Sequence, residues 1–336
     1  MSGVTIKIYN GYGHSKNLVV YGHVFKGKLA KKQISFTKKG WRHTLGLLRL
    51  FFFRPKENVH LRLYFFNQII ETRSGPDGFF KFKWASDTHL NPGLHPLKIG
   101  VIEANNEIHA FTEGRVYVAH STQYVFVSDI DDTVLISHSG SLWKRLNELL
   151  SKNAERRKIF GAHVLWYRLL STSYTTAGHT NPFFYVSSSE WNLYDYLQAI
   201  FDYNQLPVGS FLLSHFKRWH DFFKTGQTKH EDKYRRISRL LRVYPKQKFV
   251  LIGDNSQHDP LIYTALVNDY PDRIEAIYIR NIRPKKAAVT LRLLNSLSAA
   301  AVYTCMFDAT EEAIAHSVAI GLIESQHDVP LSSFKH

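Results

Sequence analysis

Residues 124–137 read YVFVSDIDDTVLIS: an apolar start is followed by three carboxylates, Asp129, Asp131 and Asp132, within four positions. Like charges this close repel one another, and an ordinary turn needs only one aspartate. We therefore expect these carboxylates either to bind a cation or to take part in a reaction. The stretch also follows a change in hydrophobic period near residue 120, which divides the chain into two halves.

The C-terminal half contains short, continuously apolar runs separated by stretches with helical periodicity. The runs are YVFVSD, FFYVSSS, KFVLIGD and EAIYIRN. Such runs are typical of a parallel sheet with helices on both faces, and active sites of these sheets lie beyond the carboxyl ends of the strands. The first three runs end in polar residues, so the sequence predicts that Asp129, Ser187 and Asp254 meet at one edge.

The N-terminal half has a period of two from about residue 3 to 120. VHLRLYF places Val59, Leu61 and Leu63 on one face of an extended chain. Several short strands at regular spacing predict an antiparallel β-sandwich-like domain over 1–120. An α/β catalytic domain, with a Rossmann-type parallel sheet, is expected over 121–336.

One segment of the N-terminal half breaks the strand pattern. Residues 38–56, KKGWRHTLGLLRLFFFRPK, mix leucine and phenylalanine with arginine and lysine. One hypothesis is a membrane-surface anchor, since basic residues are attracted to anionic lipid and apolar side chains enter the interface. The favoured alternative is a helix packed on the sandwich.

The overall charge favours an anionic partner. Lys and Arg number 43 against 28 Asp and Glu, a net charge of +15, which suits a phospholipid surface, nucleic acid or a phosphorylated small molecule. The histidines lack zinc-ligand spacing, and no apolar stretch is long enough to span a bilayer. The N-terminus does not resemble a signal peptide. We expect a cytoplasmic protein, with peripheral contact at the inner membrane surface as a hypothesis.

The polar clusters supply the parts that phosphoryl transfer requires. Asp129 can attack phosphorus to form an aspartyl phosphate, and Asp131 can protonate the leaving oxygen and later deprotonate water. Ser187 can donate a hydrogen bond to a phosphoryl oxygen, and Lys233 can offset the negative charge.

The same clusters predict a magnesium site. The expected ligands are Asp129, the main-chain carbonyl of Asp131, and Asp254, with Asp259 reaching the ion through water. Asp259 is explained equally well as a helix N-cap before Pro260. Lys233 alone could be a solvent-facing lysine of an amphipathic helix.

The polar clusters around Asp129, Ser187, Lys233 and Asp254 together resemble the haloacid dehalogenase superfamily of phosphohydrolases. SDIDDT, YVSSSEWNLYDYL, KHEDKYRRISRLLRVYPKQKFVLIGDNSQHDPLIY and EAIYIRNI are similar to the phosphatidate phosphatases associated with actin patches and their bacterial relatives. The resemblance implies a magnesium-dependent hydrolase that converts phosphatidate to diacylglycerol and phosphate, with Asp129 as nucleophile and Asp131 as acid and base. Glu190 and Asn255 stand where relatives often carry proline and serine.

The stretch between the first two motifs is long enough for a small helical cap at about 139–180. It is basic and aromatic, with residues such as Trp143, Trp166 and Tyr167, and the alternative is a helical pair that covers the sheet. The substrate also has alternatives. A soluble or nucleic-acid phosphomonoester, or a catalytically weak membrane-binding module, competes with phosphatidate. No protein partner is predicted.

Overall fold

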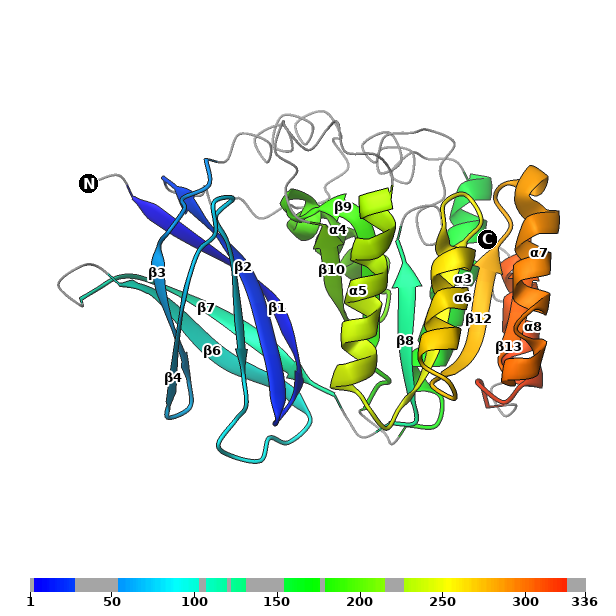
Figure 1. Ribbon diagram of the computed structural model, residues 1–336, viewed down its shortest axis with the longest axis horizontal. Helices are drawn as coiled ribbons and strands as arrows, with labels where there is room; N and C mark the ends of the chain where they lie inside the picture. Colours follow the sequence, from blue (N-terminus) through cyan, green and yellow to red (C-terminus); the bar gives the residue numbers. More distant parts are fainter. Residues whose placement is uncertain are drawn as a thin grey trace. The chain divides into compact units, whose positions relative to one another are not determined.

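The computed structural model describes residues 3–27, 54–102, 107–119, 122–130, 154–175, 179–214 and 227–324. These residues form two compact units (Figure 1). The first contains the described residues up to 119 together with 190–200, and the second contains those of 122–189, 201–214 and 227–324. Of the segment 38–56, all but the last three residues lie outside the described part.

The first unit is a single seven-stranded sheet. Its strands are β1 (Val4–His14), β2 (Asn17–Lys26), β3 (His60–Phe65), β4 (Gln68–Arg73), β5 (Phe79–Trp84), β6 (Gly93–Ile102) and β7 (Ile108–Val118). The strand order is β4-β3-β6-β7-β1-β2-β5. Neighbours pair antiparallel, except that β1 and β7 run parallel.

The period-two pattern of this half is confirmed. Val59, Leu61 and Leu63 are buried in one hydrophobic core, to which all seven strands contribute. The predicted sandwich is wrong, because the edge strands β4 and β5 contact each other and the antiparallel sheet curls around its core almost to closure. Alternation fixes which side chains point inward, but a sandwich and a curled sheet share the same alternation.

The second unit is built on a six-stranded sheet. Its strands are β8 (Tyr124–Asp129), β9 (Phe183–Glu190), β10 (Gly209–Ser214), β11 (Lys248–Asp254), β12 (Ile274–Arg280) and β13 (Tyr303–Phe307). The order is β10-β9-β8-β11-β12-β13, and the pairings of β8, β11 and β12 with their neighbours are parallel. Counted from β8, this is the doubly wound order 3-2-1-4-5-6, whose switch point lies between β8 and β11.

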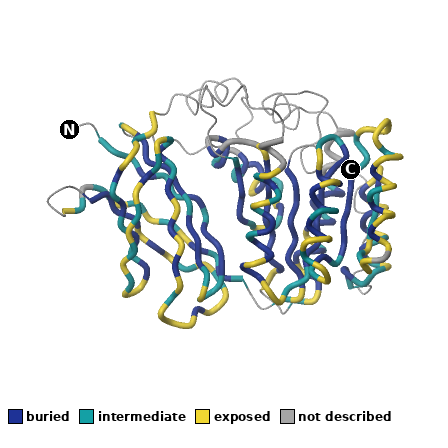
Figure 2. Tube along the Cα trace, viewed as in Figure 1, coloured by how far each residue is buried: buried dark blue, intermediate teal, exposed yellow. Residues whose placement is uncertain are grey.

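Helices connect and cover these strands. They are α3 (Ala154–Thr172), α4 (Tyr194–Tyr203), α5 (Gln227–Val243), α6 (Asp259–Asp269), α7 (Ala287–Asn295) and α8 (Thr310–Ala319), with 3-10 turns η2 (Trp191–Leu193), η4 (Pro284–Lys286) and η5 (Ser298–Ala300). Of these, η2 and the part of α4 up to residue 200 are grouped with the first unit. α3 packs beside α8, whereas α5 contacts α6 and α6 contacts α7. β8, β11 and β12 are buried almost throughout, as continuously apolar strands require (Figure 2).

Part of the predicted cap segment belongs to the body of this unit. Trp166 and Tyr167 on α3 are fully buried, and the Trp166 ring meets the ring of Tyr278 on β12 edge to face at 5.0 Å. For these two aromatics the alternative of a helix covering the sheet is therefore confirmed. Residues 131–153 lie outside the described part, so a cap there stays a prediction. Within the described residues, no helix is both long enough and apolar enough to cross a membrane.

Candidate active site

Two of the predicted carboxylates stand at the tips of neighbouring parallel strands. Asp129 ends β8 and Asp254 ends β11, and the register of the two strands pairs Ser128 with Ile252. Asp129 is 2% exposed and Asp254 is completely buried. The sequence prediction that these two side chains meet at the carboxyl edge is confirmed, because β8 and β11 are neighbours at the switch point.

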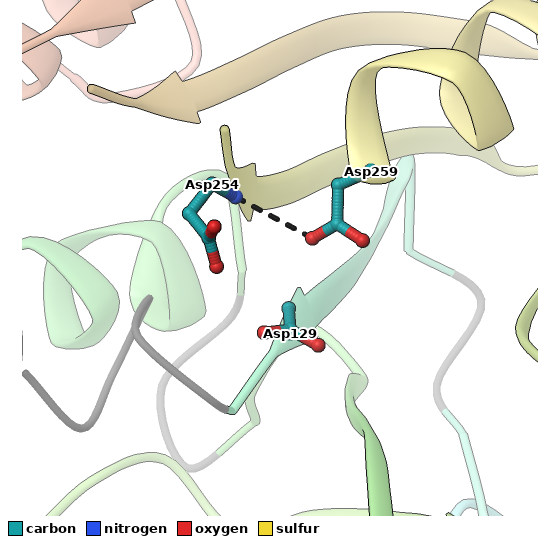
Figure 3. A group of neighbouring side chains, drawn as sticks. All are labelled: Asp129, Asp254 and Asp259. Atoms are coloured by element: carbon teal, nitrogen blue, oxygen red, sulfur yellow. Dashed lines mark hydrogen bonds between the residues drawn. The ribbon is translucent and has the colours of Figure 1, made fainter. Parts of the chain in front are cut away.

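Asp259 completes a group of three carboxylates. Oxygen atoms of Asp129, Asp254 and Asp259 all lie within 4.8 Å of one another, and Figure 3 shows the three side chains facing a common centre. The main-chain N–H of Asp254 donates to Oδ2 of Asp259 at 3.4 Å. The N-cap interpretation of Asp259 is wrong, since His258 holds the N-cap position of α6 and the Asp259 carboxylate turns toward β11.

A glycine makes room for this arrangement. A Cβ atom at Gly253 would lie 2.4 Å from Oδ2 of Asp259 and 2.9 Å from the Tyr263 hydroxyl oxygen. Both distances are shorter than real Cβ contacts. The close approach of Asp259 to β11 therefore depends on the absence of a side chain at position 253.

Lys233 joins the carboxylates from the neighbouring helix α5. Its Nζ donates a hydrogen bond to Oδ1 of Asp129 at 2.6 Å and a second, short one to Oδ1 of Asp259. The residue is only 7% exposed, which excludes the interpretation of Lys233 as a solvent-facing lysine. The ammonium group also lies over the ring of Tyr263, 6.0 Å from its centroid.

The electrostatics of the group keep Lys233 charged. Burial lowers the pKa of the Lys233 ammonium, but the charges of Asp129 and Asp259 and the hydrogen bonds to them outweigh burial and raise the pKa above its ordinary value. Burial raises the pKa of the Asp259 carboxyl; Lys233 opposes this shift, and the charge of Asp254 adds to it. Three carboxyl groups thus surround one ammonium, a donor set that suits a divalent cation.

Ser187 lies at the same edge, on β9, which pairs with β8. It is fully buried, and its carbonyl oxygen accepts a hydrogen bond from Nη1 of Arg236 at 2.8 Å. Arg236 also donates to the carbonyl of Leu212 and pairs with Asp232, so it ties the ends of β9 and β10 to α5. The hydroxyl role assigned to Ser187 stays a prediction.

A small enclosed pocket of about 40 Å³ opens beside the carboxylates, with room for a few waters or one small anion. Its lining residues are Asp129, Ser188, Lys233, Arg236, Gln257, His258, Asp259 and Ile262. Sequence reasoning did not assign a role to Ser188, Arg236, Gln257, His258 or Ile262. For Arg236 a signal was available, because it follows Lys233 by three positions and so lies on the same face of the helix.

Asn255, where the resemblance leads us to expect serine, stabilises the loop beside the site. Its Oδ1 accepts hydrogen bonds from the N–H groups of Ile282 and Arg283, both at 2.8 Å. Its Nδ2 donates to Oδ1 of Asn281 at 2.6 Å and to the carbonyl of Arg283 at 3.1 Å. The side chain thereby joins the end of β11 to the loop after β12. Asp131 and Asp132 lie outside the described residues, so the roles predicted for Asp131 stay predictions.

The fold and the site together define an α/β protein with a buried carboxylate and lysine centre at the switch point of its parallel sheet. In the comparison with known protein families, the match falls in the C-terminal half of the chain. Residues 124–281 match the family described as phosphatidate phosphatase APP1, catalytic domain. Residues 124–281 therefore resemble that catalytic domain, and the match spans just under half of the chain.

Two curated relatives align with the same half. Phosphatidate phosphatase APP1 of Saccharomyces cerevisiae is 33% identical over 158 residues, which are 46% of this chain and 25% of the yeast protein. An uncharacterized protein of Schizosaccharomyces pombe is 26% identical over 158 residues, with the same coverage. Among solved structures, a carbohydrate acetylesterase from Xanthomonas citri covers 94% of this chain and 74% of its own, at 9% identity and a TM-score of 0.36. That likeness is too weak to support an argument.

Proposed function

We propose that this chain is a magnesium-dependent phosphatase of the haloacid dehalogenase superfamily that hydrolyses phosphatidate to diacylglycerol and phosphate. The observation that carries the proposal is the Asp129 carboxylate, held by Lys233 at the tip of β8 beside Asp254 and Asp259. The family of residues 124–281 supports phosphatidate as the substrate. The strand order and the position of the site at the switch point support the superfamily.

Asp129 is the proposed nucleophile. An oxygen of its carboxylate attacks the phosphorus atom, an aspartyl phosphate forms, and the bond from phosphorus to the diacylglycerol oxygen breaks. Asp131, two residues further along the chain, gives its proton to the leaving alkoxide. In the second step Asp131 takes a proton from water, the water oxygen attacks phosphorus, and phosphate leaves as the Asp129 carboxylate is restored.

Lys233 positions the nucleophile and stabilises charge. Its raised pKa keeps the amine protonated through the reaction, so its hydrogen bonds can orient the carboxylates of Asp129 and Asp259. The same positive charge offsets the phosphoryl oxygens in a site from which water is largely excluded. Ser187 and Ser188, at the end of β9, are the proposed hydroxyl donors to the phosphoryl oxygens.

The three carboxylates fit a magnesium ion. Carboxylate oxygens are the ligands that Mg²⁺ prefers, and the buried group has three acidic side chains against the one ammonium of Lys233. Asp129 and Asp254 would hold the ion directly, together with the predicted main-chain carbonyl of Asp131, and Asp259 would hold it through water. When bound, the ion supplies positive charge to the phosphoryl oxygens.

Phosphate release from a panel of substrates tests the proposal. The wild-type protein is expected to release phosphate from phosphatidate in mixed micelles with magnesium, and to lose this activity in excess EDTA. Nucleoside monophosphates and a 3′-phosphorylated oligonucleotide serve as soluble competitors. Faster turnover of these soluble compounds would contradict phosphatidate as the substrate, and undiminished activity in EDTA would contradict the metal.

We also propose that the substrate is met at an anionic membrane surface. The net charge of +15 supports this. Sedimentation with anionic vesicles is measured for the protein with and without residues 41–53. The comparison distinguishes binding through the overall charge from binding through the anchor segment. Equal binding of both forms would remove the anchor, and no binding of either would contradict membrane contact.

A further inference from the structure

A second hollow adjoins the pocket of the candidate active site. It is an open groove of about 480 Å³ between α5 and α6. Its lining residues are Glu231, Tyr234, Arg235, His258, Leu261, Ile262 and Ala265. The α6 residues among them recur at intervals of three and four positions, so they form one stripe that begins at the active-site end of the helix.

The groove and the pocket are neighbours with shared walls. His258 and Ile262 line both of them. The pocket, at about 40 Å³, has room for a phosphoryl group and little more. If the phosphate of a phosphomonoester occupies the pocket, the rest of the molecule must extend outside it. The groove begins at two residues of the pocket wall.

The chemistry of the groove suits an uncharged, apolar chain. Leu261, Ile262 and Ala265 provide aliphatic surface, and Leu261 is 52% exposed. The charged rim residues neutralise each other, since Arg235 pairs with Glu231 at 3.0 Å. At the far end the Tyr234 hydroxyl donates to Asp269. This lining offers a nucleotide no lysine, and its one arginine, Arg235, is paired with Glu231, whereas a lipid tail would bury the exposed aliphatic surface.

We propose that this groove, between α5 and α6, binds the glycerol ester and the first methylenes of an acyl chain of a lipid phosphomonoester whose phosphate occupies the pocket. The inference rests on the proposed function and adds to it the part of the protein that recognises the lipid. The stripe from His258 to Ala265 is about 10 Å long at the rise of an α-helix, which is comparable with an extended octanoyl chain.

Chain-length dependence of turnover tests the groove. kcat/KM is measured for dihexanoyl and dioctanoyl phosphatidate at concentrations at which both are monomeric. The wild-type protein is expected to prefer the longer substrate, by up to about fourfold for each additional methylene that becomes buried. In Leu261→Asp the preference is expected to disappear, because a carboxylate in the groove opposes burial of the chain.

Leu291→Asp is the matched control, because Leu291 is a similarly exposed leucine (42%) on α7, outside the groove and the pocket. It should keep the wild-type preference. If the wild-type protein turned over both lipids without preference, lipid binding in the groove would be contradicted, but the proposed substrate would stand. The same conclusion would follow if the two variants changed the chain-length preference equally. Failure to turn over either lipid, with retained turnover of p-nitrophenyl phosphate, would overturn both proposals.

Discussion

The Lys233 amine joins Asp129 and Asp259, carboxylates that lie 104 and 26 positions away from it in the sequence. Each of the three residues comes from a different element: the end of β8, the helix α5 and the first turn of α6. The centre is therefore a product of the doubly wound topology, and its integrity can be tested residue by residue.

Replacement of Lys233 by methionine should weaken both the fold and catalysis. Loss of the ammonium leaves buried carboxylates without their partner, which costs about 3–5 kcal/mol of unfolding free energy. Loss of a charge that stabilises the transition state should lower kcat by roughly 10²–10³. Urea unfolding in EDTA and phosphate release measure the two effects. Lys285→Met, at an exposed lysine, is the control, and equal stability of the two variants would contradict the buried pairing.

Replacement of Gly253 by alanine should displace Asp259. The new Cβ would overlap Oδ2 of Asp259 and the Tyr263 hydroxyl, so the first turn of α6 must move. We expect a loss of about 1–3 kcal/mol of unfolding free energy together with reduced phosphate release. Gly75→Ala, whose Cβ would come no closer to a neighbouring atom than 3.3 Å, the distance to an Asp77 carboxylate oxygen, is the control. If Gly253→Ala kept wild-type activity, phosphate release would not depend on the present position of Asp259.

Replacement of Asn255 by serine should loosen the connection between β11 and the loop after β12. A serine hydroxyl cannot replace all four hydrogen bonds of the asparagine, and each lost bond costs about 1 kcal/mol. A drop of about 2–3 kcal/mol in unfolding free energy is expected. Asn295→Ser, at an exposed position of α7, should be neutral. Unchanged stability of Asn255→Ser would mean that this network is not a structural constraint.

His163, buried on α3, should make the folded state sensitive to acid. Burial, with a smaller contribution from the charge of Arg280, lowers the pKa of His163 to about 3, and its Nδ1 lies 2.6 Å from Oγ1 of Thr310. Between this value and the ordinary pKa of about 6.5, the unfolded chain binds a proton that the folded chain does not. Stability is therefore full above about pH 6.5 and falls with decreasing pH by up to about 1.4 kcal/mol per pH unit.

His163→Asn preserves a polar partner for Thr310 without a titrating group. Unfolding free energies of both proteins between pH 4 and pH 7 should diverge in slope, with the steeper dependence in the wild type. Parallel curves would contradict a neutral, buried His163.

Much of the site could be predicted because it depends on strand order. The apolar runs ending in Asp129, Ser187 and Asp254 were recognisable as parallel strands, whose carboxyl ends share one edge. Lys233 was recognisable only as a member of a set of motifs. Its position between two carboxylates depends on the rotation of α5 about its axis, which local sequence does not determine.

Other features depend on tertiary geometry. The start of α6 was predicted one residue late, since Asp259 before Pro260 has the composition of an N-cap although its carboxylate serves the site. The curled sheet of the first unit includes a parallel pair, β1 with β7, which alternation within single strands does not reveal. The groove between α5 and α6 arises from the spacing of two helices and has no signature in either one.

The identity of the nucleophile is the central claim. Phosphate release from phosphatidate with magnesium should be compared between the wild-type protein and Asp129→Asn, after circular dichroism spectra have established that both are folded. The proposed mechanism predicts a loss of about a thousandfold or more, because an amide cannot form the phosphoenzyme. Activity of Asp129→Asn within about tenfold of the wild-type rate would contradict Asp129 as the nucleophile.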